Sequence, residues 1–342
     1  MMAQVLLNQV IGNSLHLRQK KNIYFVIPML MLFGVLEVAM RIAGYPPGKT
    51  YMISGDGDPR WEDPELFWTP SGAFAEQFQK AKISPAENLI YCYGGSIVQG
   101  FSASKPFASI LEKRLRAEYS ADAVVINWAA QGYSSYQSRV IAQRSVSTAP
   151  PRIIIESNAW NDHEIGSYSD LEIAEMNRGF DRKVLYVTNR SVAFAQMRRI
   201  LLRRDEIQPP GATWPYRMTA RVPVKDYRKQ ILKFVALAES ADADLILLTQ
   251  GQYSKTLRQN LLPYHEVMED IASQFSHVYL MDIRPAIEKA VMDELGLDDL
   301  LDQPGTKNSY ILDMCHPTAK GHKLIADALF PLVYRILQQH NE

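Results

Sequence analysis

Short apolar runs alternate with longer amphipathic segments along most of the chain. Five runs predict buried strands, at residues 89–93, 123–128, 153–155, 245–248 and 278–281. Helical spacing is found at residues 106–119, 134–147, 224–240, 263–275 and 317–338, and several of these segments begin with the Ser or Pro common at helix starts. Buried strands that alternate with helices predict an α/β fold with a doubly wound parallel sheet.

The N-terminal region has the pattern of a membrane signal. An uninterrupted apolar run, 23–36, follows several basic residues, but as a helix it would span only roughly 21 Å of a hydrocarbon core of roughly 30 Å. Extension to residue 43 includes Glu37 and Arg41, which can pair at i, i+4. We therefore expect an uncleaved transmembrane signal-anchor helix at 22–43, and a cleaved signal peptide is the alternative.

The charges on either side of this helix predict its orientation. The basic residues precede it, in a predicted cytoplasmic tail at 1–21, whereas acidic residues follow it. By the positive-inside rule, the rest of the chain lies on the extracytoplasmic side of the membrane, periplasmic or extracellular.

The remainder of the chain divides into a spacer and one large domain. Residues 44–86 are rich in Gly, Pro and aromatic residues and predict an irregular juxtamembrane spacer, and 87–342 form the α/β domain. About 80 residues separate the third strand from the fourth, which predicts a basic insertion at about 165–225. Its basic residues form either a solvated helix face or a rim that contacts anionic lipid or glycan.

Composition narrows the classes of function. The 342 residues are 47% hydrophobic and carry no net charge, so the chain can bury a full core and has no overall attraction for nucleic acid. Cys92 and Cys315 lack the spacing of a zinc site, and two buried thiols are favoured over a disulfide. Asp162, His163 and Glu164 are consecutive and point in different directions, so no metal and no cofactor are expected.

A serine and a histidine follow the first and last predicted elements of the sheet. Ser96 comes after the first strand and after two glycines, which permit a sharp turn. Asp313 and His316 are three residues apart, so the carboxylate can orient the imidazole while the other ring nitrogen accepts the Ser96 proton. Each motif alone also fits a simple turn or a helix cap.

Two further residues can complete an oxyanion hole. Gly132 follows the second strand and Asn161 follows the third, and parallel strands bring their carboxyl ends to one edge of a sheet. The N–H groups of Ser96 and Gly132 and the Asn161 amide can then converge on a developing oxyanion, where loss of one donor costs roughly 100- to 1000-fold in rate.

These blocks resemble the SGNH (GDSL-like) hydrolases, a family named for the Ser, Gly, Asn and His of its conserved blocks. The segment 313–322 is the most specific match, because Pro317, Gly321 and His322 also fit the family's usual continuation. The resemblance covers roughly residues 89–337 and implies a flavodoxin-like three-layer α/β/α fold with a five-stranded parallel sheet. Gly95 and Ala159 depart from the family's usual Asp and Gly, which affects the shape of the pocket.

The residues and the resemblance together predict a membrane-anchored serine esterase. It would hydrolyse a carboxylic ester, with an acetyl or short acyl group, through an acyl-Ser96 intermediate, on an acylated small molecule, lipid or glycan. One alternative is an O-acyltransferase that resolves the same intermediate with a hydroxyl of an envelope polysaccharide. A second is a non-catalytic envelope protein that retains the fold. No oligomeric state is predicted.

Overall fold

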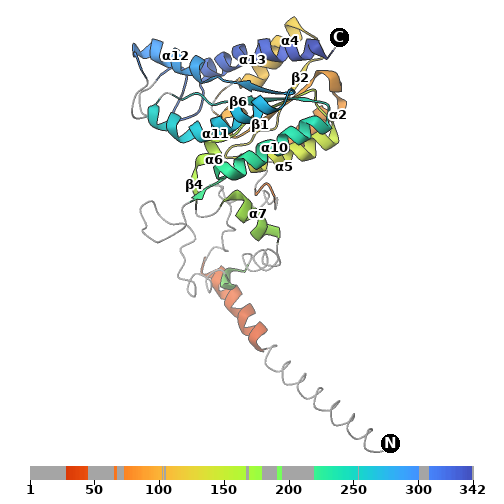
Figure 1. Cartoon of the computed structure of the whole chain (residues 1–342). Helices are drawn as coiled ribbons and strands as arrows, with labels where there is room; N and C mark the ends of the chain where they lie inside the picture. Colours follow the sequence, from red (N-terminus) through yellow and green to blue (C-terminus); the bar gives the residue numbers. More distant parts are fainter. Residues whose placement is uncertain are drawn as a thin grey trace, which may run out of the picture. The chain divides into compact units, whose positions relative to one another are not determined.

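A five-stranded parallel sheet forms the centre of the computed structural model, in the strand order β2-β1-β3-β6-β7 (Figure 1). Its strands are β1 (Leu89–Gly94), β2 (Val124–Asn127), β3 (Ile153–Ser157), β6 (Asp244–Leu248) and β7 (Val278–Met281). The predicted five-stranded α/β fold is confirmed, and this strand order is that of flavodoxin-like folds. The structure describes residues 28–44, 65–67, 73–101, 103, 105–166, 169–178, 191–194, 219–252, 254–299 and 308–340.

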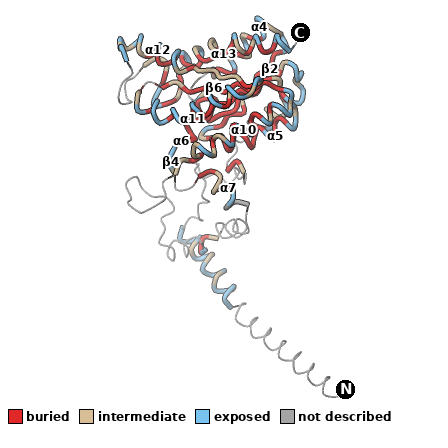
Figure 2. Tube along the Cα trace, in the orientation of Figure 1, coloured by how far each residue is buried: buried red, intermediate tan, exposed pale blue. Residues whose placement is uncertain are grey.

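Helices cover both faces of the sheet, which gives three layers (Figure 1). One face carries α4 (Phe107–Glu118), α12 (Arg284–Leu295) and α13 (Ala319–Gln339), and the other carries α2 (Ala73–Ile83), α5 (Ser135–Thr148), α10 (Val224–Ser240) and α11 (Lys255–Gln274). Because both faces are covered, β1, β3 and β6 are buried along their whole length, as Figure 2 shows. This explains why their sequences are continuous apolar runs rather than alternating ones.

Several helices differ from the sequence prediction, among them α2, α11 and α12, and α12 lies outside the predicted helical segments. The predicted spacer contains α2, whose Phe74 and Ala81 are buried in the core, so the expectation of an irregular segment there was wrong. The helix predicted to start at Pro263 starts at Lys255 instead, because the Ser254 side chain caps it by accepting from Leu257 N at 3.3 Å. Pro263 lies inside this helix, where it removes one backbone hydrogen bond without ending the helix.

The chain divides into two units, of which the smaller comprises residues 1–57 and 178–214. Its described helix covers 28–42, and Glu37 pairs with Arg41 at 2.7 Å, as predicted from their spacing. Glu37 also accepts hydrogen bonds from Ser191 Oγ and from the backbone N–H groups of Val192 and Ala193. This carboxylate therefore joins the two stretches of chain that make up the unit.

The membrane-spanning prediction lies partly outside the described residues, since 22–27 are not among them. Within the part of the chain that the structure describes, no helix is both long enough and apolar enough to cross a membrane. The anchor at 22–43 and the tail at 1–21 therefore stay predictions.

The predicted basic insertion is described near its two ends and at residues 191–194, which belong to the smaller unit. Near the ends, β4 (Ile165–Gly166) pairs antiparallel with β5 (Thr219–Ala220), and α7 (Asp170–Arg178) follows β4. Residues 179–190 and 195–218, which include many of its basic residues, lie outside the described part. Both described ends belong to the larger unit, which also contains the sheet.

Candidate active site

Ser96 lies where β1 ends. It is the first residue of a short helix, α3 (Ser96–Gln99), with Gly95 as the residue before it in extended conformation. Because the first N–H groups of a helix have no acceptor within it, the Ser96 N–H is a donor that faces out of the helix end.

His316 and Asp313 lie on the segment before α13 and complete a chain of hydrogen bonds to the serine. His316 Nε2 lies 2.8 Å from Ser96 Oγ, and His316 Nδ1 lies 2.7 Å from Asp313 Oδ2. The structure thus joins residues that are 220 positions apart in the chain. With the imidazole proton on Nδ1, Nε2 is the acceptor for the Ser96 hydroxyl.

The Asp313 carboxylate is held in its charged form. Burial raises its pKa, but the backbone N–H groups of Cys315 and His316 donate to Oδ1, each at 2.9 Å, and together with the His316 side chain they lower the pKa below its usual range. The same carboxylate therefore shapes the turn and orients the imidazole. An ionised Asp313 stabilises the imidazolium that forms when His316 takes a proton.

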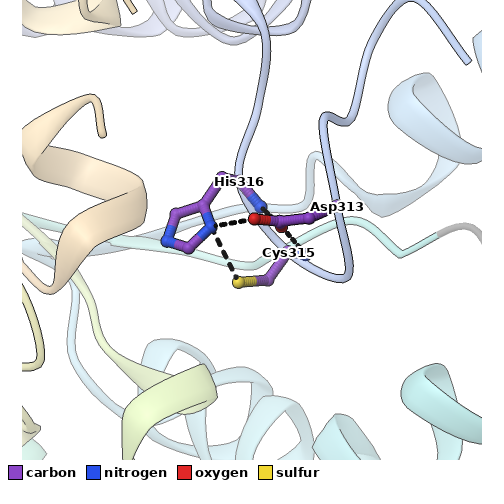
Figure 3. A group of neighbouring side chains, drawn as sticks. All are labelled: Asp313, Cys315 and His316. Atoms are coloured by element: carbon purple, nitrogen blue, oxygen red, sulfur yellow. Dashed lines mark hydrogen bonds and ion pairs between the residues drawn. The ribbon is translucent and has the colours of Figure 1, made fainter. Parts of the chain in front are cut away.

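Cys315 lies beside this pair, as Figure 3 shows. Its sulfur is 3.6 Å from His316 Nδ1, and donor atoms of Asp313, Cys315 and His316 all lie within 4.8 Å of one another. Burial raises the pKa of the Cys315 thiol, which keeps it protonated and makes it a poor metal ligand. Cys92 is buried as well, and both cysteines are free, as the sequence favoured.

Asn161 and the turn after Gly132 meet the serine from the neighbouring strands. Asn161 lies on a short helix, α6 (Ala159–His163), and its Nδ2 donates to the Tyr133 carbonyl oxygen at 2.7 Å. Gly132 has a φ of +75°, a conformation that glycine adopts without strain. Since an amide nitrogen carries two protons, the second one on Asn161 remains to face an oxyanion.

Gly95 fits closely against this amide. A Cβ atom at Gly95 would lie 1.9 Å from Asn161 Nδ2 and 3.0 Å from the Tyr133 carbonyl oxygen. No side chain can occupy that space while Asn161 keeps its position. The departure from the family's usual Asp at this position is therefore a requirement of this chain's own packing.

Phe101 is a residue that the sequence did not single out. Its ring lies 4.7 Å from the His316 imidazole, measured between centroids, and the side chain is partly exposed. Phe101 is a single large apolar residue in a mostly polar segment, so neither hydrophobic periodicity nor the spacing of a motif identifies it in the sequence. Its ring limits the space around the imidazole.

A small apolar cavity adjoins the nucleophile helix. Its volume is about 20 Å³, and its lining includes Ile97, Val98, Phe107, Cys315 and Ile325. This volume is close to what one water molecule occupies.

No family model matches the sequence, and no curated protein matches it. Solved structures that resemble the fold include an α/β hydrolase enzyme from the metagenome of Lake Arreo, Spain, at 17% identity over 75% of this chain and 99% of that chain, with a TM-score of 0.48. A member of the lipolytic protein G-D-S-L family from Veillonella parvula matches at 16% identity over 72% and 98%, with a TM-score of 0.45. A catalytic mutant of an acetylxylan esterase from Geobacillus stearothermophilus matches at 14% identity over 75% and 96%, with a TM-score of 0.46.

Proposed function

We propose that this protein is a serine esterase that hydrolyses a carboxylic ester through an acyl-Ser96 intermediate. The observation that carries the proposal is the continuous hydrogen-bonded chain from Ser96 Oγ through His316 to Asp313. A nucleophile, a base and an orienting carboxylate in this geometry are what acyl transfer to a serine hydroxyl requires.

The reaction has two steps. Ser96 Oγ attacks the ester carbonyl while its proton passes to His316 Nε2, and the tetrahedral intermediate collapses when His316 returns that proton to the leaving alcohol. A water molecule then attacks the acyl-serine while His316 takes its proton. The bond between the acyl carbon and Ser96 Oγ breaks as His316 returns that proton to Oγ, and the acid leaves. The N–H groups of Ser96 and Gly132 and the Asn161 amide are the donors proposed for the oxyanion in both steps.

The acyl group is proposed to be acetyl or another short chain. The Phe101 ring lies 4.7 Å from the His316 imidazole, measured between centroids, and limits the space near the reacting atoms. This crowding supports a small acyl group. The alcohol is proposed to belong to an acylated small molecule, lipid or glycan.

The reaction is proposed to take place outside the cytoplasm, with the chain held by a membrane anchor at 22–43. In the described part of this segment, large apolar side chains are exposed, among them Leu32 at 71% and Ile42 at 82%. Contact with lipid would remove these side chains from water. Extraction of membranes with alkaline carbonate tests the anchor. The full chain should stay with the membrane, and a chain without residues 1–43 should be released.

The central test is turnover of p-nitrophenyl acetate by Ser96→Ala. We expect turnover to fall to the level of the uncatalysed reaction, since the nucleophile is lost. Ser147→Ala is the matched control, because Ser147 Oγ bonds only its own helix, at Gln143 O, and is exposed. Retained turnover by Ser96→Ala would exclude the assignment.

Product analysis distinguishes hydrolysis from acyl transfer. The proposal predicts free acid as the main product both with and without an added polysaccharide acceptor. Acylated polysaccharide formed at the expense of free acid would show that a sugar hydroxyl resolves the same intermediate.

A further inference from the structure

A buried ion pair lies behind the Gly132 turn. Arg221 and Asp170 are 8% and 1% exposed, and the guanidinium forms two bonds to the carboxylate, Nη2 to Oδ2 at 2.9 Å and Nε to Oδ1 at 3.2 Å. The two residues are 51 positions apart and flank the described ends of the insertion, after β4 and after β5. The transfer of two charges out of water is costly, so a buried ion pair adds little to the stability of the fold. Its presence here indicates a further role.

Arg221 also contacts the turn that carries the proposed Gly132 oxyanion donor. Its Nη1 donates to the Gly132 carbonyl oxygen at 2.7 Å. The next carbonyl, that of Tyr133, accepts from the Asn161 amide at 2.7 Å. Arg221 therefore fixes a peptide plane directly beside the group that orients Asn161.

Asp170 holds the other side of the same turn. Ser134 Oγ donates to Asp170 Oδ2 at 2.6 Å, and Arg221 Nη2 also reaches Gln137 Oε1 at 3.0 Å. Gln137 in turn accepts from Ser134 N at 2.9 Å. The pair thus contacts the turn at Gly132 and at the first residues of α5.

The backbone of the pair is joined to the segment that follows Asn161. Asp170 N donates to Arg221 O at 2.7 Å, Arg221 N donates to Glu164 O at 2.8 Å, and the next residue, Val222, donates to Asp162 O at 3.0 Å. Through these bonds and the side-chain bonds to the Gly132 turn, the Asp170–Arg221 pair connects the segment after Asn161 with the turn at Gly132.

The electrostatics keep the Arg221 guanidinium charged. Burial lowers the pKa of Arg221, but the nearby Asp170 carboxylate outweighs burial and raises it. The guanidinium therefore keeps its planar fork of donors, which reaches a carboxylate and a carbonyl oxygen at once.

We propose that Asp170 and Arg221 are positioning residues for the oxyanion hole: together they set the Gly132–Tyr133 turn and, through Tyr133, the Asn161 amide. This inference rests on the proposed esterase function. It also means that hydrogen bonds connect the described ends of the insertion, at Asp170 and Arg221, to the proposed oxyanion hole.

The test compares Arg221→Ala with the wild-type chain in turnover of p-nitrophenyl acetate. We expect kcat to fall about 10- to 100-fold with KM within about threefold, because displaced donors weaken transition-state binding and leave ground-state binding largely intact. The rate of labelling of Ser96 by a fluorophosphonate should fall in parallel. Millimolar guanidinium should restore part of kcat by refilling the vacated position.

Arg139→Ala is the matched control. Arg139 is also buried, at 7% exposed, and its Nε bonds Gln230 Oε1 at 3.2 Å on α10 rather than the Gly132 turn. Its loss should lower Tm while kcat stays unchanged. If Arg221→Ala folds poorly, the neutral pair Arg221→Met with Asp170→Asn removes both charges together and avoids an unpaired buried charge.

The outcomes separate the two proposals. The positioning role is overturned if the folded Arg221→Ala variant or the folded double variant keeps the wild-type kcat, or if only its KM rises. It is also overturned if kcat falls by the same factor in that variant as in Arg139→Ala. Ser96→Ala in the same assay reports on the esterase itself, because turnover by that variant would overturn the function on which the inference rests.

Discussion

At the residue scale, the contact between Gly95 and Asn161 decides how the proposed oxyanion hole is built. The family that the sequence resembles usually has an aspartate at the position of Gly95, and such a side chain would collide with the Asn161 amide. In this chain the amide occupies that space and is held there by the Tyr133 carbonyl oxygen. The missing side chain at Gly95 therefore leaves the space that the Asn161 amide occupies.

Gly95→Ala tests this contact. The new Cβ would lie 1.9 Å from Asn161 Nδ2, so the amide must move, and loss of one oxyanion donor costs roughly 100- to 1000-fold in kcat. Steady-state turnover of p-nitrophenyl acetate and the circular dichroism spectrum are the measurements. Gly34→Ala, whose Cβ meets nothing within 4 Å, should leave turnover unchanged. A folded Gly95→Ala chain with wild-type kcat would show that Asn161 does not act as a donor.

The sequence predicted some of these residues and not others for a physical reason. Asp313 and His316 are three residues apart, so their contact is local and their spacing reveals it. Arg221 meets Gly132 across 89 positions, and nothing in the pattern around Arg221 distinguishes it from the other basic residues of the insertion. Contacts of that kind depend on how the sheet brings strand ends together.

At the element scale, burial explains both the correct and the wrong predictions. The strands were found because burial on both faces makes them continuous apolar runs. The helix α2 was missed because it is short and follows a segment rich in Pro and aromatic residues, although Phe78 packs on Trp128 with ring centroids 4.6 Å apart. Tertiary packing, rather than an obvious sequence period, stabilises this helix.

The start of α13 lies close to the segment that carries the proposed catalytic pair, Asp313 and His316. A Cβ atom at Gly321 would lie 2.2 Å from the Tyr310 carbonyl oxygen and 3.0 Å from Pro317 Cβ. The Tyr310 carbonyl oxygen also accepts from Thr318 N at 2.8 Å. Gly321 therefore sets how closely the helix approaches the segment that contains Asp313 and His316.

Gly321→Ala should push the helix and this segment apart. The overpacking cost of about 1–3 kcal/mol exceeds the gain of about 1 kcal/mol in helix propensity, so Tm should fall. We expect kcat to fall as well, about 10-fold or more, because His316 shifts relative to Ser96. Lys323→Ala on the same helix removes an exposed ion pair with Asp327 and serves as the control with unchanged kcat. Equal kcat in the two variants would contradict the prediction.

At the scale of the whole molecule, zero net charge coexists with acidic groups deep in the core. Glu156 and Asp162 are both fully buried at the carboxyl end of β3 and just beyond it. Burial raises the pKa of Glu156 to about 8, although a hydrogen bond from Asn158 lowers it. Burial also raises the pKa of Asp162 well above its usual value, against the hydrogen bonds from Ser135 and with the charge of Glu156 adding to the rise. The protonation of this cluster therefore links stability to pH.

Glu156→Gln tests this linkage. In the unfolded chain this carboxyl has a pKa near 4.5, and in the fold it is about 8, so the folded state holds a proton that the unfolded state releases. Its contribution to stability is therefore complete below pH 4.5, declines as pH rises and is lost above about pH 8. Glutamine resembles the protonated acid at every pH. Its oxygen can keep the hydrogen bond that Asn158 Nδ2 donates to Glu156 Oε1 at 2.8 Å.

We therefore expect the free energy of unfolding of Glu156→Gln, relative to the wild-type chain, to increase between pH 5 and pH 8. The expected change is on the order of a few kcal/mol, since each unit between the two pKa values corresponds to about 1.4 kcal/mol. Urea denaturation at several pH values in this range is the measurement, and Glu175→Gln, which removes an exposed carboxylate on α7, is the control for loss of an acidic group outside the core. Glu156 and Asn161 lie on consecutive elements, so kcat measured on the same samples reports whether this proton also affects the oxyanion hole. Parallel stability curves for Glu156→Gln and the wild-type chain would mean that Glu156 is ionised to the same degree in the folded and unfolded states.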